Sequence, residues 1–177
     1  MIDAEASRRL LAAPWLAEVD PDIKKAILNV LVEARAPAGA ILLEQGQPND
    51  HLTFLIDGTA EIERTFSNGR RENLTTLTAP AIFGTTSFFQ PNPPTVTVRA
   101  TSDVWMLSLY HEAHEALRRS NPRSAEALAL AVLRVLSERF DLIDKLFVDY
   151  IARHPDESAK TSEWSSFRAR LFEDSNI

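Results

Sequence analysis

The spacing of hydrophobic positions follows a helical period over the first forty residues of the chain. The strongest start signal is Asp20-Pro21-Asp22: Asp20 is suited to cap a helix, proline fits the first turn, and Asp22 favours the positive end of the helix dipole. Pro37 ends the pattern, because proline interrupts a helix. We therefore predict helices up to about residue 37, with one apolar face made by Ile23, Ala26, Ile27, Val30 and Leu31.

From residue 40 to residue 109 the pattern changes to short alternating or β-branched segments, which is typical of strands. All five glycines lie in or beside this region, at the boundaries where turns are expected. Asn68-Gly69 is the clearest hairpin signal. Many short strands without interleaved helices indicate an antiparallel roll or barrel. The predicted strands are residues 40–45, 52–57, 59–65, 72–77, 95–101 and 103–109.

Helical spacing returns after Tyr110, first in residues 111–120 and then in a long segment, 123–151. The predicted fold class is α+β: an antiparallel β-roll (jelly roll) flanked by N-terminal helices and a long C-terminal helix. We divide the chain into a domain of residues 1–122, the long helix 123–151, and a tail, 152–177. Trp164, Phe167 and Phe172 in this tail fit a short docking helix.

The long helix carries an apolar seam with the 4-3-4-3-4-3 spacing of a coiled coil. A second apolar stripe runs beside it and is interrupted by Arg139. Two stripes on one helix need two partners. Either the helix is buried within its own domain, or one stripe packs on the roll and the other on a second subunit. We predict the second arrangement, a homodimer. The seam consists of Ala129, Leu133, Leu136, Phe140, Ile143, Phe147 and Tyr150; the second stripe consists of Leu128, Val132, Val135, Leu142 and Leu146.

Composition narrows the class of protein. Hydrophobic residues make up 45% and charged residues 25% of the 177 residues, as in an ordinary soluble globular protein. The net charge of −6 argues against a nucleic-acid partner. The absence of cysteine excludes disulfides and thiolate metal sites. With no long apolar run and no signal peptide, we expect a cytoplasmic protein without a membrane partner.

Several spaced motifs resemble the cyclic-nucleotide-binding domain family. Residues 37–63 match its opening strands, with a Gly-x-x-x-Asp turn at Gly46 and Asp50. Phe83-Gly84 matches the start of the family's phosphate-binding cassette, and residues 97–100 match its end. The resemblance covers roughly residues 10–150. Over this range the chain is similar to the sensory half of bacterial regulators such as the catabolite activator protein. It implies the β-roll fold described above.

The same resemblance implies a degenerate ligand pocket. In the family cassette a glutamate binds the ribose and an arginine pairs with the cyclic phosphate; the matching positions here are Thr85 and Pro94. Removing one partner of a buried ion pair costs about 3–5 kcal/mol, and proline offers neither charge nor donor. We predict that cAMP and cGMP do not bind in the usual way. The implied pocket residues are Phe83, Gly84, Thr85, Thr86, Ser87, Pro94 and Thr95.

Other arginines are poor substitutes for the missing one. Arg99 matches an outward-facing strand position, and Val98 is expected to take the inward place. Arg70 and Arg71 are expected in a solvated turn rather than over the pocket mouth.

The residues that follow Gly84 leave two alternatives open. The hydroxyls of residues 85–87 either accompany a weak anion site at a helix start or merely cap a turn. Phe88 and Phe89 are bulky for this place and are expected to fill the pocket from within, while residues 91–94 form a stiff loop.

Candidate catalytic or metal chemistry is sparse. His111 and His114 are three residues apart, whereas the HExxH zinc motif requires four, so a structural role is favoured for them. No P-loop, nucleophile elbow or paired-carboxylate motif is present. We therefore expect no enzyme, metal or cofactor. The 26 residues after Ile151 are too few for a helix-turn-helix module, so no DNA-binding domain is expected.

Two functional hypotheses follow. The first is a non-catalytic regulatory or scaffold protein in signalling, which dimerises through the long helix and acts on a protein partner that the sequence does not identify. The alternative is a sensor of a small ligand, a cyclic nucleotide or another metabolite, with a rebuilt pocket. Fold analogy alone does not choose between them.

Overall fold

The computed structural model describes residues 2–90 and 92–153. The predictions for Trp164, Phe167 and Phe172 fall outside these residues. The chain begins with α1 (Ala4–Leu11), a short 3₁₀ helix η1 (Pro14–Leu16) and α2 (Pro21–Leu28). Asp20 caps α2 as predicted, because its Oδ1 accepts a hydrogen bond of 2.8 Å from the backbone N–H of Asp22.

The predicted helical stretch up to Pro37 is wrong in its last part. Helix α2 ends at Leu28, and Val32–Ala36 form strand β1, which pairs with a strand near the end of the roll. The residues of β1, VEARA, alternate apolar and polar, although alanine, glutamate and arginine are good helix formers. Tertiary pairing therefore overrides local propensity here.

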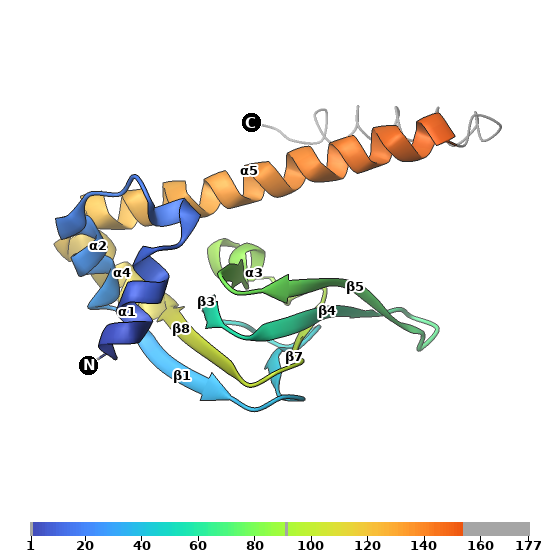
Figure 1. The fold of residues 1–177 in the computed structure, drawn as a ribbon, viewed down its shortest axis with the longest axis horizontal. Coiled ribbons are helices and arrows are strands. Elements are labelled where there is room, and N and C mark those ends of the chain that lie inside the picture. The colour runs from blue at the N-terminus through green and yellow to red at the C-terminus, as the bar shows by residue number, and fades with distance from the viewer. Residues whose placement is uncertain (1, 91, 154–177) are drawn as a thin grey trace. The chain divides into compact units, whose positions relative to one another are not determined.

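Two four-stranded antiparallel sheets make up the roll (Figure 1). The predicted antiparallel β-roll is therefore confirmed, and the sequence prediction missed only the short strands at the sheet edges, β1 and β6. The first sheet has the order β1-β8-β3-β6, with β8 at Val104–Tyr110, β3 at His51–Asp57 and β6 at Ala81–Phe83; the second has the order β2-β7-β4-β5, with β2 at Ile41–Leu43, β7 at Thr97–Ala100, β4 at Thr59–Thr65 and β5 at Arg71–Thr78.

The apolar core of the roll is formed by the inward residues of both sheets. Its buried members are Leu43, Leu55, Ala60, Ala81, Phe83, Val98, Ala100, Val104 and Met106. In Figure 1, α1, α2 and α4 (His111–Ser120) lie together at one end of the roll, and the β4–β5 hairpin extends from the other end. The hairpin turn at Asn68-Gly69 is confirmed, with Gly69 N–H donating to the carbonyl of Phe66 at 2.9 Å.

Gly58 joins β3 to β4 in a place that admits no side chain. Its φ is +87°, in the left-handed region, and a Cβ added there would lie 2.3 Å from the carbonyl oxygen of Asp103. Both the backbone conformation and the close approach require glycine.

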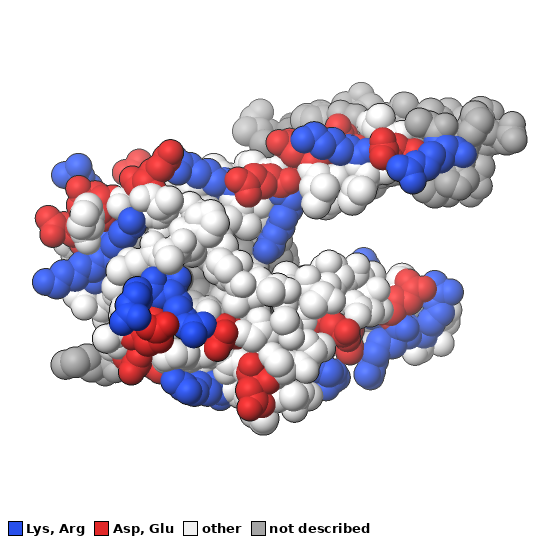
Figure 2. Space-filling model, viewed as in Figure 1, with Lys and Arg blue, Asp and Glu red and all other residues white. Residues whose placement is uncertain are grey.

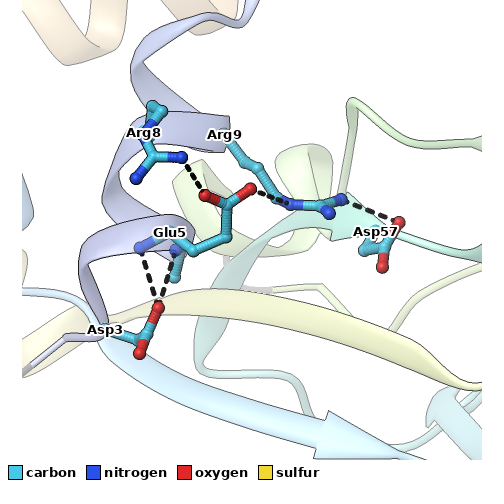
Figure 3. A network of polar contacts seen from close by, with 6 residues as sticks. Asp3, Glu5, Arg8, Arg9 and Asp57 are labelled. Atoms are coloured by element: carbon cyan, nitrogen blue, oxygen red, sulfur yellow. Dashed lines mark hydrogen bonds and ion pairs between the residues drawn. The ribbon is translucent and has the colours of Figure 1, made fainter.

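A network of polar contacts fastens α1 to the roll (Figure 3). Asp3 caps the helix by accepting from the backbone N–H groups of Glu5 and Ala6, and the Glu5 carboxylate pairs with Arg8 and Arg9. Arg9 also reaches Asp57 at the end of β3, at 2.9 Å. These groups are largely exposed, so each pair adds little stability and the network mainly orients α1.

The long C-terminal helix is present as α5 (Pro122–Arg153) and crosses the boundary between two compact units, of which the first ends at Val132. In the first unit Leu128, Ala131 and Val132 are buried. In the second unit both predicted stripes are represented by exposed side chains, namely Leu133, Phe140 and Ile143 of the seam and Leu142 and Leu146 of the second stripe. The side chains of Phe147 and Tyr150 lie outside the described part.

The visible face of the molecule mixes acidic and basic side chains without a basic stripe (Figure 2). Within the part of the chain that the structure describes, no helix combines the length and apolarity needed to cross a bilayer.

Candidate functional site

The candidate site starts where β6 passes into the short helix α3 (Thr85–Phe89) through Gly84. Gly84 has a φ of +77°, and a Cβ there would lie 2.9 Å from the carbonyl oxygen of His51. Glycine therefore lets the start of α3 approach the first residue of β3. Phe83, which precedes it, is buried in the core of the roll.

Asn49 holds this corner in place and was not among the residues predicted from the sequence. Its Nδ2 donates to the carbonyl of His51 at 2.7 Å and to Ser87 Oγ at 3.0 Å. Its Oδ1 is buried and has no hydrogen-bond partner within residues 2–90 and 92–153. The one available signal was its place inside the Gly-x-x-x-Asp turn, between Gly46 and Asp50. Asn49 thus ties the loop before β3 to α3.

The hydroxyl groups at the start of α3 do not cap it. Gly84 occupies the cap position without any side-chain hydrogen bond. Ser87 Oγ donates to the carbonyl of Gly84 at 3.3 Å, so it bonds to an acceptor rather than to a free amide. Thr85 is buried and Thr86 is exposed. Position 85, where a carboxylate is expected in the family cassette, holds a buried neutral side chain.

Pro94 is buried in the loop that closes the site. Its carbonyl accepts a hydrogen bond of 2.9 Å from Gly46 N–H, and the neighbouring Gln45 N–H donates to Thr97 Oγ1 at 3.1 Å. The loops before β3 and before β7 are therefore joined to each other. Thr95, also proposed as a pocket residue, is exposed. Position 94 offers neither a positive charge nor a donor.

The prediction that Arg99 faces outward is confirmed. Val98 is fully buried in the core of the roll, while the Arg99 guanidinium lies 3.4 Å from Glu63 Oε1 and donates to the carbonyl of Gly39 at 3.1 Å. Arg70 pairs with Glu72 at 2.6 Å on the exposed hairpin. Arg71 is exposed and lies 3.8 Å from Glu63. These arginines are engaged by carboxylates of the second sheet.

The expectation that Phe88 and Phe89 fill the pocket from within is wrong. Neither ring belongs to the apolar core of the roll. Phe88 contacts the rings of His111 and His114 at centroid distances of 5.8 and 5.3 Å, and Phe89 contacts His114 at 5.9 Å. The imidazole rings of α4 meet the phenyl rings edge to face, which is a favourable geometry. The two phenylalanines therefore bind α3 to α4.

His114 is only 7% exposed, and burial lowers its pKa below the usual value because the charged form is desolvated. Arg118 and His111 act in the same direction on this pKa, and Glu115 opposes them. Among the described residues no group of three or more ligating side chains is arranged to hold a metal. The contacts of His114 fit the structural role predicted for it.

Replacing His114 by Phe is expected to reduce the loss of stability in mild acid. The unfolded chain protonates this histidine near pH 6.5, whereas the folded chain does so only at lower pH, so folding weakens as pH falls below about 6.5. Phenylalanine keeps a ring against Phe88 without a proton to bind. Urea unfolding between about pH 7 and 5 measures the difference.

The matched control is His111→Phe, because His111 is exposed and borders the same cluster as Glu115, Arg118 and Glu126. His111→Phe retains His114, so this control should still lose stability as the pH falls, unlike His114→Phe. Parallel profiles for wild type and His114→Phe would contradict the assignment.

Comparisons with known proteins agree on the fold. The family model described as cyclic nucleotide-binding domain matches residues 33–121. A CRP-like cAMP-activated global transcriptional regulator of Mycobacterium tuberculosis is 31% identical over 141 residues, which cover 76% of this chain and 61% of the regulator. The chain thus spans about three fifths of the length of this curated relative.

Two solved structures are similar over the same region. The N-terminal domain of a transcriptional regulator from Streptomyces coelicolor has a TM-score of 0.64 at 28% identity, with 76% of this chain and 94% of that chain covered. The catabolite activator protein of Thermus thermophilus has a TM-score of 0.63 at 25% identity, with 76% and 63% covered.

Proposed function

The chain belongs to the cyclic nucleotide-binding domain family, and we propose that it is a non-catalytic cytoplasmic regulatory protein that does not bind cAMP or cGMP in the usual way. It acts through protein contacts, as a homodimer joined along the seam of α5. The observation that carries the proposal is the buried, uncharged state of the two cassette positions that should recognise the nucleotide, Thr85 and Pro94.

A cyclic phosphate keeps one negative charge at neutral pH, and burying it without a cation is costly. The arginine nearest to Pro94 along the chain is Arg99. Its guanidinium is held by Glu63 and the Gly39 carbonyl on the outer side of β7. Turning it inward would require breaking these contacts and displacing Val98 from the core. The backbone carbonyl of Pro94 accepts a hydrogen bond from Gly46 N–H. This bond opposes a movement of the loop that would bring another cationic side chain to the phosphate position.

The dimer is supported by the exposed part of the seam. Leu133, Phe140 and Ile143 are each more than half exposed, and their separations of seven and three residues fit the heptad of a two-stranded coiled coil. Large apolar side chains exposed side by side on one helix are typical of an interaction surface. A second copy of the same helix supplies a matching seam.

A thermal titration tests the nucleotide proposal. A ligand with a Kd of about 10 μM would, at about 1 mM, stabilise the folded state by about 2.7 kcal/mol. For a chain of this size that is a rise in Tm of about 5–10 °C. We expect cAMP and cGMP to change the Tm by less than about 1 °C. A rise of several degrees would favour the alternative, a sensor with a rebuilt pocket.

A double substitution supplies a positive control for the titration, because it should restore cAMP binding. Thr85→Glu together with Pro94→Arg restores the two side chains that the family cassette uses, and cAMP should then raise the Tm by a few degrees. The matched control, Thr85→Gln with Pro94→Gln, relaxes the loop in the same way but adds no charge, so it should stay unresponsive. An equal response of both variants would mean that charge at these positions is not what limits binding.

A further inference from the structure

A cavity of about 570 Å³ lies between α3, α4 and the first turns of α5, within the first compact unit. This volume is in the range of small-molecule sites. The cavity involves the outer contacts of α3, through Phe88 and Phe89, rather than the core of the roll. Neither the cassette positions 85 and 94 nor the exposed seam residues beyond Val132 line it.

Aromatic rings form one wall of this cavity. Phe88 and Phe89 are perpendicular to each other, with centroids 5.1 Å apart, and His114 packs against both. Phe89 remains 44% exposed, so a face of this cluster is open to a ligand. Aromatic faces attract cations through their quadrupole.

The acidic and basic side chains that line the cavity sum to a net negative charge. The Glu115 carboxylate is paired with Arg118 at 2.7 Å, so these two charges offset each other. Glu126 also lines the cavity, and within the described residues it forms no hydrogen bond or ion pair. One carboxylate is therefore left available to a ligand.

His114 adds a polar group to the wall. Although it is 93% buried, its ring nitrogens form no hydrogen bond within residues 2–90 and 92–153. Burial keeps the ring neutral at pH 7, because its pKa lies below the usual value. A neutral imidazole has one nitrogen that accepts a hydrogen bond. Because His114 lines the cavity, its imidazole can offer a ligand a hydrogen-bond acceptor.

We propose that this cavity binds a small organic cation, a protonated amine attached to an aromatic or aliphatic body. The ammonium group donates to the Glu126 carboxylate and to the imidazole of His114, and the apolar body lies against Phe88 and Phe89. An anion is disfavoured, because the guanidinium of Arg118 is already neutralised by Glu115. The proposal does not rest on the loss of cyclic-nucleotide binding, because positions 85 and 94 do not line the cavity, whereas Ala129 of the seam does.

Three probes of similar shape and different charge test the proposal: 2-phenylethylamine, 2-phenylethanol and phenylacetate. Each is titrated into the full chain at about pH 7.5, and binding is followed by amide and aromatic chemical shifts in NMR spectra. We expect a Kd of about 1 mM for the amine, as befits so small a ligand, with the largest shifts in α3, α4 and the first turns of α5. The alcohol should bind about tenfold more weakly, and phenylacetate more weakly still.

Substitution of Glu126 assigns the effect to this cavity. Glu126→Gln should reduce the preference for amine over alcohol to about threefold or less, with little change in the affinity for the alcohol. Glu112→Gln is the matched control, since it removes the same charge from an exposed position of α4 that does not line the cavity, and it should bind the amine like the wild type. Both positions are exposed, so the variants should fold.

The proposal would be overturned by the absence of saturable shifts with the amine up to about 10 mM, by equal affinity for amine and alcohol, or by tighter binding of phenylacetate. Equal effects of Glu126→Gln and Glu112→Gln would also overturn it, because the attraction would then come from the overall negative charge of the protein.

Discussion

Replacing Phe140 and Ile143 by Asp should convert the protein from a dimer to a monomer while the β-roll stays folded. Both residues lie near the middle of the seam, and central apolar groups carry most of the binding energy of such interfaces. Two carboxylates in a desolvated contact would remove about 2 kcal/mol or more each, which weakens dimerisation by at least about a thousandfold. Because both side chains are already exposed within the described chain, the substitutions should not unfold the roll.

Light scattering measures the mass and circular dichroism measures the β content of the variant. The second stripe supplies a matched control, Leu142→Asp with Leu146→Asp, because these residues are as exposed as Phe140 and Ile143 and lie on the same helix. If the seam forms the interface, this control should weaken dimerisation much less. A wild-type protein that is monomeric at tens of micromolar contradicts the dimer. Loss of the whole fold would assign the stripe to the interior of one subunit.

The largest expected effect on folding comes from Gly58→Ala. Alanine in the left-handed region costs about 1–2 kcal/mol, and its Cβ would also lie 2.3 Å from the Asp103 carbonyl oxygen, which is backbone and cannot rotate away. We expect a total loss above about 3 kcal/mol in the free energy of unfolding, measured in urea.

Gly39→Ala provides the control for backbone strain alone. Gly39 has the same φ of +87°, but nothing lies within 4 Å of an added Cβ. The Gly39→Ala variant should therefore lose only about 1–2 kcal/mol in the free energy of unfolding. Similar losses for both variants would mean that the chain between β3 and β4 is free to move away from Asp103.

The sequence predicted most of the fold because its strands alternate and its turns carry glycine. The hairpin at Asn68-Gly69, the start of α2 at Pro21 and the helix 111–120 needed only local signals. Strand β1 did not follow from such signals, because Val32–Ala36 suits a helix and becomes a strand only by pairing with β8. Strand β6 is three buried residues long, too short for any period to be visible.

The sequence predicted which side chains occupy the candidate site better than it predicted which residues these side chains contact. The outward direction of Arg99 followed from strand alternation alone. The direction of Phe88 and Phe89 did not, because it depends on two histidines that lie more than twenty residues further along the chain. Asn49 was missed for a similar reason, since its partner Ser87 lies 38 residues further along the chain.

Equilibrium dialysis of labelled cAMP against the full chain tests the central claim most directly, because it detects bound nucleotide without relying on stability. With Thr85 and Pro94 in the cassette, we expect no bound cAMP above background at about 100 μM of each component, with the Thr85→Glu, Pro94→Arg variant run beside it. Saturable binding of one cAMP per wild-type chain with a Kd in the low micromolar range would contradict the claim.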